Sequence, residues 1–263
     1  MSTTPTPEAA VAASAKERTP MPAARYFYSG AALVLLLCTF WGFDNFYLHG
    51  KAPGGAEITS QIRTLVVVHG VVMTAWMLLF AVQPQLIAGR KYRIHKALGK
   101  AGAVIAATAV VLGSFVAVES ARFNPPDTLN WGLLPRQFLT FALVPIWLFG
   151  LFVTIAIVNR STPDIHRPMM LTAVLAAMPP PLFRIDPVRE AFEDSLPGNI
   201  FGPFAPALAL ALIFLIVKWL LFRRFDRWLG IGCGALAVAG AVLMRLATTG
   251  MWDRFASILS AVM

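Results

Sequence analysis

The stretch at residues 64–100 reads TLVVVHGVVMTAWMLLFAVQPQLIAGRKYRIHKALGK, and it decides the fold. It consists of an apolar run at about 64–88, a basic turn, and the start of a second apolar run. A helix rises about 1.5 Å per residue, so a run of this length matches the roughly 30 Å hydrocarbon layer of a bilayer. The stretch therefore predicts two transmembrane helices joined by a short basic turn.

Similar apolar runs fill most of the chain. The chain is 57% hydrophobic and 13% charged, whereas soluble domains are roughly 25% charged, so lipid must cover much of its surface. We expect an all-α polytopic bundle with about seven spans and a four-helix core, formed by runs two to five at about 64–185. The runs lie at about 27–48, 64–88, 101–121, 138–158, 167–183, 204–222 and 228–248.

The fifth run, 167–183, is short and contains Pro179, Pro180 and Pro181 near its end. Proline lacks a backbone N–H and breaks a helix, so this run is expected to span only where neighbouring helices cover its backbone. A six-span bundle without this run is the alternative, and it would place the carboxyl terminus on the other side of the membrane.

Basic residues are distributed unevenly between alternate connections. The amino-terminal segment and the loops at 88–100, 159–167 and 218–227 contain 14 of the 22 Lys and Arg residues. By the positive-inside rule these connections face the cytoplasm. We therefore expect a bacterial inner-membrane protein with a cytoplasmic amino terminus. The net charge of +9 is then explained by the orientation of the chain in the membrane and by its contact with anionic lipid headgroups. Nucleic acid is therefore not an expected partner.

Three regions follow from this topology. Residues 1–25 are rich in Ala, Thr and Pro and are expected to form a flexible cytoplasmic tail. Residues 26–250 form the predicted transmembrane domain. Residues 251–263 mix aromatic and polar side chains, as an interfacial segment does.

Two of the predicted cytoplasmic turns carry the same motif. An isoleucine, a histidine and a basic residue stand at the start of the returning helix, once at 94–96 and once at 165–167. Two helical hairpins that run in the same direction would be related by a pseudo-two-fold axis along the membrane normal. The motif therefore predicts that His95 and His166 lie at the same depth on the cytoplasmic side.

Two imidazoles on facing helices can hold a haem from both sides. We expect His95 and His166 to bind a haem b in a membrane redox protein, with Lys96, Arg167 and Arg90 near its propionates. The first turns of the two helices also favour negative charge. The same residues suit the headgroup of an anionic lipid, or another anion, in a non-enzymatic binding or transport protein. They are also typical of helix ends anchored in the headgroup zone, and an accessory subunit of a larger membrane complex is a further alternative.

His69 is a third candidate metal ligand. It begins a stripe along one helical face that ends near Gln83, and polar residues in such a stripe indicate a face turned toward the protein interior. The alternative is that both side chains are hydrogen-bonded to neighbouring helices.

Cys38 and Cys233 have no CxxC spacing, and no phosphate loop or HExxH motif is present. Soluble-type hydrolase and nucleotide chemistry is therefore disfavoured, and the pattern identifies no reaction.

These polar positions resemble a bacterial family of predicted multi-pass membrane proteins. The resemblance covers about 64–185 and implies a shared four-helix core with shared polar positions, but no reaction. Lys96 stands where that family usually has arginine. The matching residues are His69, Gln83, Arg90, His95-Lys96-Ala97-Leu98-Gly99, Trp147, Arg160, His166-Arg167-Pro168-Met169 and Arg184.

The core is also distantly similar to four-helix b-type cytochromes, the membrane reductases that place histidines on alternate core helices, one pair for each haem. That similarity implies one pair, His95 and His166. Run four has no histidine to stand opposite His69, so the similarity implies a single haem.

Overall fold

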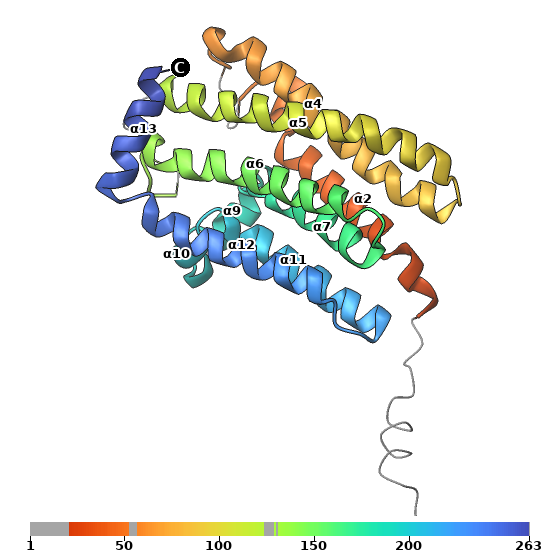
Figure 1. Ribbon diagram of the computed structural model, residues 1–263. Coiled ribbons are helices and arrows are strands. Elements are labelled where there is room, and N and C mark those ends of the chain that lie inside the picture. The colour runs from red at the N-terminus through yellow and green to blue at the C-terminus, as the bar shows by residue number, and fades with distance from the viewer. Residues whose placement is uncertain (1–20, 53–56, 124–128, 130, 263) are drawn as a thin grey trace, which may run out of the picture.

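The computed structural model describes residues 21–52, 57–123, 129 and 131–262, and this part of the chain is helical throughout, without strands. Most of the predicted tail at 1–25 therefore lies outside the described residues. The elements, labelled in Figure 1 where there is room, are η1 (Pro22–Tyr26), α2 (Phe27–Gly42), α3 (Asp44–His49), α4 (Ser60–Ala88), α5 (Tyr92–Phe123), α6 (Pro135–Val158), α7 (Pro163–Ala176), α8 (Pro179–Leu182), α9 (Asp186–Phe192), α10 (Leu196–Phe201), α11 (Phe204–Phe222), α12 (Arg227–Leu246) and α13 (Gly250–Val262).

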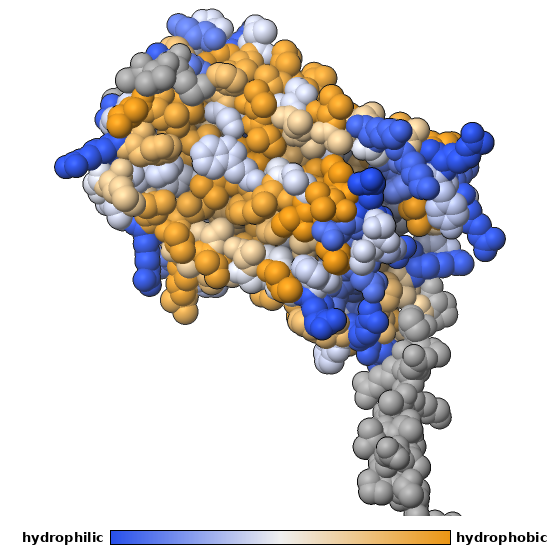
Figure 2. Space-filling view, in the orientation of Figure 1, coloured by the Kyte–Doolittle hydropathy of each residue, from blue (hydrophilic) through white to orange (hydrophobic). Residues whose placement is uncertain are grey.

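Six helices of the described chain are long and apolar enough to cross a membrane: η1 with α2, then α4, α5, α6, α11 and α12. Their outward faces carry large apolar side chains such as Leu37, Val71 and Leu212. Figure 2 shows this apolar surface, with polar side chains gathered toward the ends of the bundle. The chain is an integral membrane protein with a polytopic helical bundle in contact with lipid, as its hydropathy predicts.

The fifth apolar run forms α7, a helix of 14 residues, followed by the four-residue α8. The helix is broken at Ala177, and α8 then begins at the proline triplet. Leu171, Val174 and Leu175 are fully buried, because α7 packs against α2, α6, α11 and α12. Neighbouring helices therefore cover this run as expected. It is not among the six candidate spans, so the count of seven spans stays a prediction.

The basic turns meet at one end of the bundle, at the right in Figures 1 and 2. Arg224, between α11 and α12, forms an ion pair of 3.6 Å with Asp164 in the first turn of α7. Met21, before η1, donates its backbone N–H to the Leu221 carbonyl at 2.8 Å. The end that carries the turns at 88–92, 159–163 and 223–227 is hereafter called the basic end. Its predicted cytoplasmic location is an expectation from charge.

Close packing around α7 and α8 depends on two glycines. A Cβ on Gly42 of α2 would lie 2.1 Å from the Pro181 carbonyl oxygen, and a Cβ on Gly232 of α12 would lie 2.3 Å from the Thr172 hydroxyl. Small residues let helix backbones approach closely within a membrane bundle. Gly42 and Gly232 thus allow α2 and α12 to enclose the broken fifth run.

The carboxyl-terminal segment forms α13, which contacts α5 and α6 at the end of the bundle opposite the basic end. Buried Trp252 donates its indole N–H to the Arg136 carbonyl at 2.9 Å. Met251, Phe255 and Ile258 are exposed on the same helix. An apolar outer face suits the predicted interfacial position of this segment.

Candidate functional site

His95 and His166 lie close together at the basic end. His95 is in the first turn of α5, after the turn that closes the α4–α5 hairpin, and His166 is in the first turn of α7, after the turn that closes the α6–α7 hairpin. Their ring centroids are 6.4 Å apart, and their ring planes are nearly perpendicular, at 86°. The structure thus brings together, at one depth, the two histidines that the repeated turn motif predicts.

The tautomer of His166 follows from its hydrogen bond. Its Nδ1 lies 2.9 Å from the carbonyl oxygen of Ala156, which is fully buried in the last turns of α6. A carbonyl oxygen can only accept, so Nδ1 carries the proton and donates it. Nε2 of His166 therefore keeps a free lone pair, and the ring is held in one orientation, as is usual for metal-binding histidines.

His95 has an unsatisfied buried nitrogen. Its Nδ1 is buried and has no hydrogen-bond partner among the described residues. The His95 backbone carbonyl accepts from the Gln83 side-chain amide of α4 at 3.4 Å, while the Gln83 Oε1 is also buried and unpartnered in the described chain. Buried polar atoms are nearly always hydrogen-bonded, so His95 Nδ1 and Gln83 Oε1 leave hydrogen-bonding capacity for a bound molecule at this end of the bundle.

The predicted basic residues of these turns have no carboxylate partner in the described part of the chain. The side chains of Arg90, Lys96 and Arg167 are exposed, and none of them forms an ion pair with another described residue. Arg90 lies in the α4–α5 turn with a positive φ of 58°. The charge of Arg167 is close enough to act on both His95 and Lys218. The basic end therefore presents a field that favours an anion.

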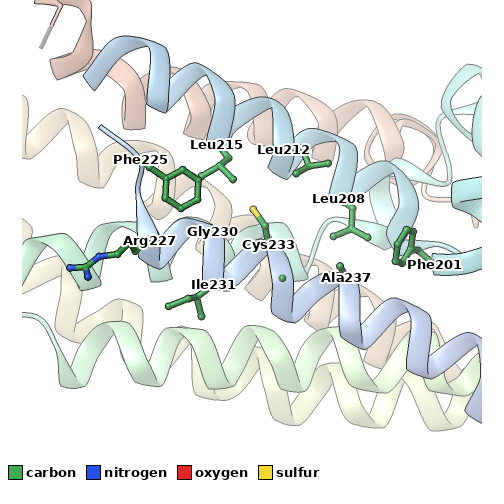
Figure 3. Close-up of a pocket in the computed structure, with 11 residues that line it drawn as sticks. Phe201, Leu208, Leu212, Leu215, Phe225, Arg227, Gly230, Ile231, Cys233 and Ala237 are labelled. Atoms are coloured by element: carbon green, nitrogen blue, oxygen red, sulfur yellow. The ribbon is translucent and has the colours of Figure 1, made fainter. Parts of the chain in front are cut away.

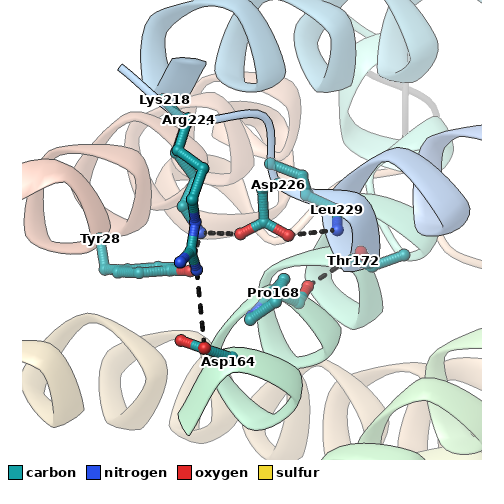
Figure 4. Close-up of polar contacts among 8 residues, drawn as sticks. All are labelled: Tyr28, Asp164, Pro168, Thr172, Lys218, Arg224, Asp226 and Leu229. Carbon is teal, nitrogen blue, oxygen red and sulfur yellow. Dashed lines mark hydrogen bonds and ion pairs between the residues drawn. The ribbon is translucent and has the colours of Figure 1, made fainter. Parts of the chain in front are cut away.

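Lys218 is a functional candidate whose predicted position in the chain is wrong. Its assignment to the loop at 218–227 is incorrect, because Lys218 lies within α11 and is only 6% exposed. Its ammonium donates to the Tyr28 hydroxyl of α2 and to the Asp226 carboxylate (Figure 4). The same ammonium lies 5.6 Å from the centre of the Phe222 ring.

Asp226 links this buried ion pair to a helix terminus. Its Oδ1 accepts the Leu229 backbone N–H at 2.9 Å and so caps the amino terminus of α12. Beside it, Arg224 pairs with Asp164 (Figure 4). The network joins α2, α7, α11 and α12 at the basic end. The only sequence signal for it was a lysine at the end of an apolar run, next to an acidic residue in the following turn.

The structure does not bring His69 to the other two histidines. A Cβ on Gly113 of α5 would lie 3.0 Å from His69 Cε1, so the His69 ring packs against that glycine. From His95 to Gly113 is eighteen residues of one helix, about 27 Å. His69 is thus near the opposite end of the bundle, where its Nδ1 is buried without a partner in the described residues. The three predicted metal ligands do not form one site, and no cluster of three or more His, Cys, Asp or Glu occurs in the described part of the chain.

Arg184, the last residue of the family pattern, follows α8. Its guanidinium lies 4.8 Å from the Phe43 ring centre and 4.7 Å from that of Phe183, and it donates to the Pro180 carbonyl. Burial lowers the pKa of the Arg184 guanidinium to about 10, so the group stays charged at neutral pH. It binds the turn after the proline triplet to the aromatic side chains around it.

The contacts of the site and the positions of the two hairpins can be compared with those of known proteins. No protein-family model, no curated protein and no solved structure matches the chain.

Proposed function

We propose that this integral membrane protein binds one haem b at the basic end, with His95 and His166 as its two axial ligands. The separation of 6.4 Å between the two ring centroids carries this proposal. A haem needs only two ligands from the protein because the porphyrin supplies the other four. A bare zinc ion would need about four protein or water ligands, so a pair of histidines suits haem better.

The geometry of the pair supports this assignment. Two imidazoles that bind opposite sides of one first-row metal ion, through bonds of about 2 Å, have ring centres about 6 Å apart. The observed separation is 6.4 Å. His166 already donates from Nδ1 to Ala156 and so offers Nε2, while His95 has a buried nitrogen without a partner in the described chain.

The surrounding charges fit the same ligand. Lys96 and Arg167 follow the two histidines directly, and Arg90 stands in the adjoining turn. Cationic side chains at this position would offset the two propionates of a haem through charge-assisted hydrogen bonds. A haem held by His95 and His166 would supply one-electron transfer. The chain's own part is to fix the two rings, supply positive charge and exclude lipid.

The haem content of the purified protein tests this proposal. The protein is produced in cells supplied with a haem precursor, purified in mild detergent, and its extracted haem is measured against protein concentration. We expect about one haem per chain, because the two ligands form one site. Colourless protein from haem-replete cells would overturn the proposal.

A second candidate function is the binding of an anionic lipid or another anion by the same turns. It is favoured by the exposed side chains of Arg90 and Arg167, which have no ion-pair partner among the described residues. This candidate predicts colourless protein that retains phosphatidylglycerol and loses it in Arg90→Ala or Arg167→Ala. The haem measurement therefore separates the two functions, since only the first predicts a coloured protein.

A further inference from the structure

A groove runs between α11 and α12 and has a volume of about 650 Å³ (Figure 3). Its walls are apolar and include Leu208, Leu212 and Leu215 from α11 and Ile231 from α12. Both helices are candidate membrane spans. The groove therefore opens toward lipid, and its volume is within the range of ligand-binding sites.

The groove exists because one face of α12 carries only small residues at three positions. Gly230, Gly234 and Ala237 line it, and their spacing of four and three residues places them on the same helical face. The ring of Phe225 fills the space beside Gly230, where a Cβ would lie 2.8 Å from it. A Cβ on Gly234, in contrast, would meet nothing within 4 Å. The middle of the groove is therefore open.

Positive charge stands at the mouth of the groove. Arg227, the first residue of α12, lines its end at the basic end of the bundle. The Arg227 side chain forms no hydrogen bond or ion pair with another described residue, and the neighbouring carboxylate of Asp226 is paired with Lys218. Arg223, also exposed, precedes it in the turn. A cation without an ion-pair partner among the described residues thus adjoins an apolar groove at the basic end of the bundle.

The groove extends along both helices from the basic end. From Arg227 to Ala237 is ten residues of α12, about 15 Å, and Phe201 and Leu208 line the groove beyond the middle of α11. The groove is thus charged at its Arg227 end and apolar along the rest, which is the distribution of polarity along one phospholipid.

We propose that this groove binds one anionic phospholipid, with an acyl chain between α11 and α12 and its phosphate against Arg227. Basic pockets between transmembrane helices on the positive side of a membrane protein recognise such lipids through their headgroups. The apolar contacts supply affinity, and the arginine supplies the preference for negative charge. This site shares no residue with the haem site proposed above, so either proposal can fail alone.

Native mass spectrometry of the detergent-purified full chain, titrated with phosphatidylglycerol or phosphatidylcholine, tests the site. We expect the wild type to retain phosphatidylglycerol preferentially. Arg227→Gln should weaken phosphatidylglycerol binding by about fivefold, as for loss of one cation near a membrane surface, and should remove the headgroup preference. Gly234→Leu should weaken the binding of both lipids, because leucine fills the open middle of the groove.

The matched control is Gly30→Leu on α2, another glycine whose Cβ would meet nothing within 4 Å but which does not line the groove. It should bind lipid as the wild type does. Leucine favours a helix over glycine by about 1 kcal/mol, so neither glycine variant is expected to unfold. Unchanged lipid binding in both Gly234→Leu and Arg227→Gln overturns the proposal. The proposal is also overturned if the wild type forms a dimer in the mass spectrum and Gly234→Leu abolishes that dimer while lipid binding stays intact. A helix of a second copy would then be the occupant of the groove.

Discussion

His166→Ala is expected to purify with at least about tenfold less haem than the wild type. Changes to the residues that merely orient a metal ligand cost about 10- to 100-fold in affinity, and loss of a ligand costs no less. The hydrogen bond to Ala156 orients His166, and its Nε2 is the nitrogen that remains free. Removing the ring removes both the ligand and its orientation. The measurement is extracted haem per chain at equal expression.

His95→Ala is expected to lose haem to the same extent, because one missing axial ligand is enough to open the site. His69→Ala is the control within the membrane domain: its ring packs against Gly113, about 27 Å along α5 from His95. His49→Ala is a control at an exposed position. Both controls should keep wild-type haem. Full haem in both His95→Ala and His166→Ala would refute the axial assignment, whatever the controls show.

Lys218→Met is expected to produce the largest loss of stability among single substitutions at the basic end. It leaves Asp226, itself largely buried, without the ammonium that neutralises it. Removing one partner of a buried ion pair typically costs about 3–5 kcal/mol, because the remaining charge is uncompensated. The free energy of unfolding, measured by denaturant titration in detergent micelles, should fall by about that amount.

Two further variants distinguish a buried ion pair from loss of packing alone. Asp226→Asn keeps a side-chain acceptor at the amino terminus of α12, since asparagine also caps helices. The double variant Lys218→Met with Asp226→Asn should therefore be more stable than Lys218→Met, because no unpaired charge remains. Lys100→Met, at an exposed position of α5, should change stability by less than about 0.5 kcal/mol. Wild-type stability in Lys218→Met would contradict the assignment of this network.

The spans were predictable because lipid imposes a length and a composition on each one. Run two was expected to end near residue 88, and α4 ends at Ala88. Run three was expected at 101–121, whereas α5 begins at Tyr92. The basic turn residues continue the helix because Lys and Arg are good helix formers, so hydropathy alone marks the helix start too late.

The fifth run shows why hydropathy could not decide the number of spans. A 14-residue helix broken before prolines is stable here because four other helices surround it. That coverage depends on tertiary contacts with α2, α11 and α12, which no local pattern contains. The sequence could indicate the break at Pro179, but it could not indicate what encloses it.

The candidate site was predictable in part. The repeated turn motif predicted that His95 and His166 share a depth, because two hairpins with the same direction bring their turns to one face. The separation of the two rings, the Ala156 acceptor and the orphaned His95 nitrogen could not be predicted from the sequence, because they depend on side-chain packing. The position of Lys218 was missed because its partner Tyr28 is 190 residues away along the chain.

Ligation of a haem by His95 and His166 is tested most directly by the optical spectrum of the dithionite-reduced wild-type protein. With imidazole on both faces of the iron, we predict a Soret band together with sharp, well-separated α and β bands. A spectrum without a Soret band, or one with a Soret band but broad and unresolved α and β bands, would contradict the claim.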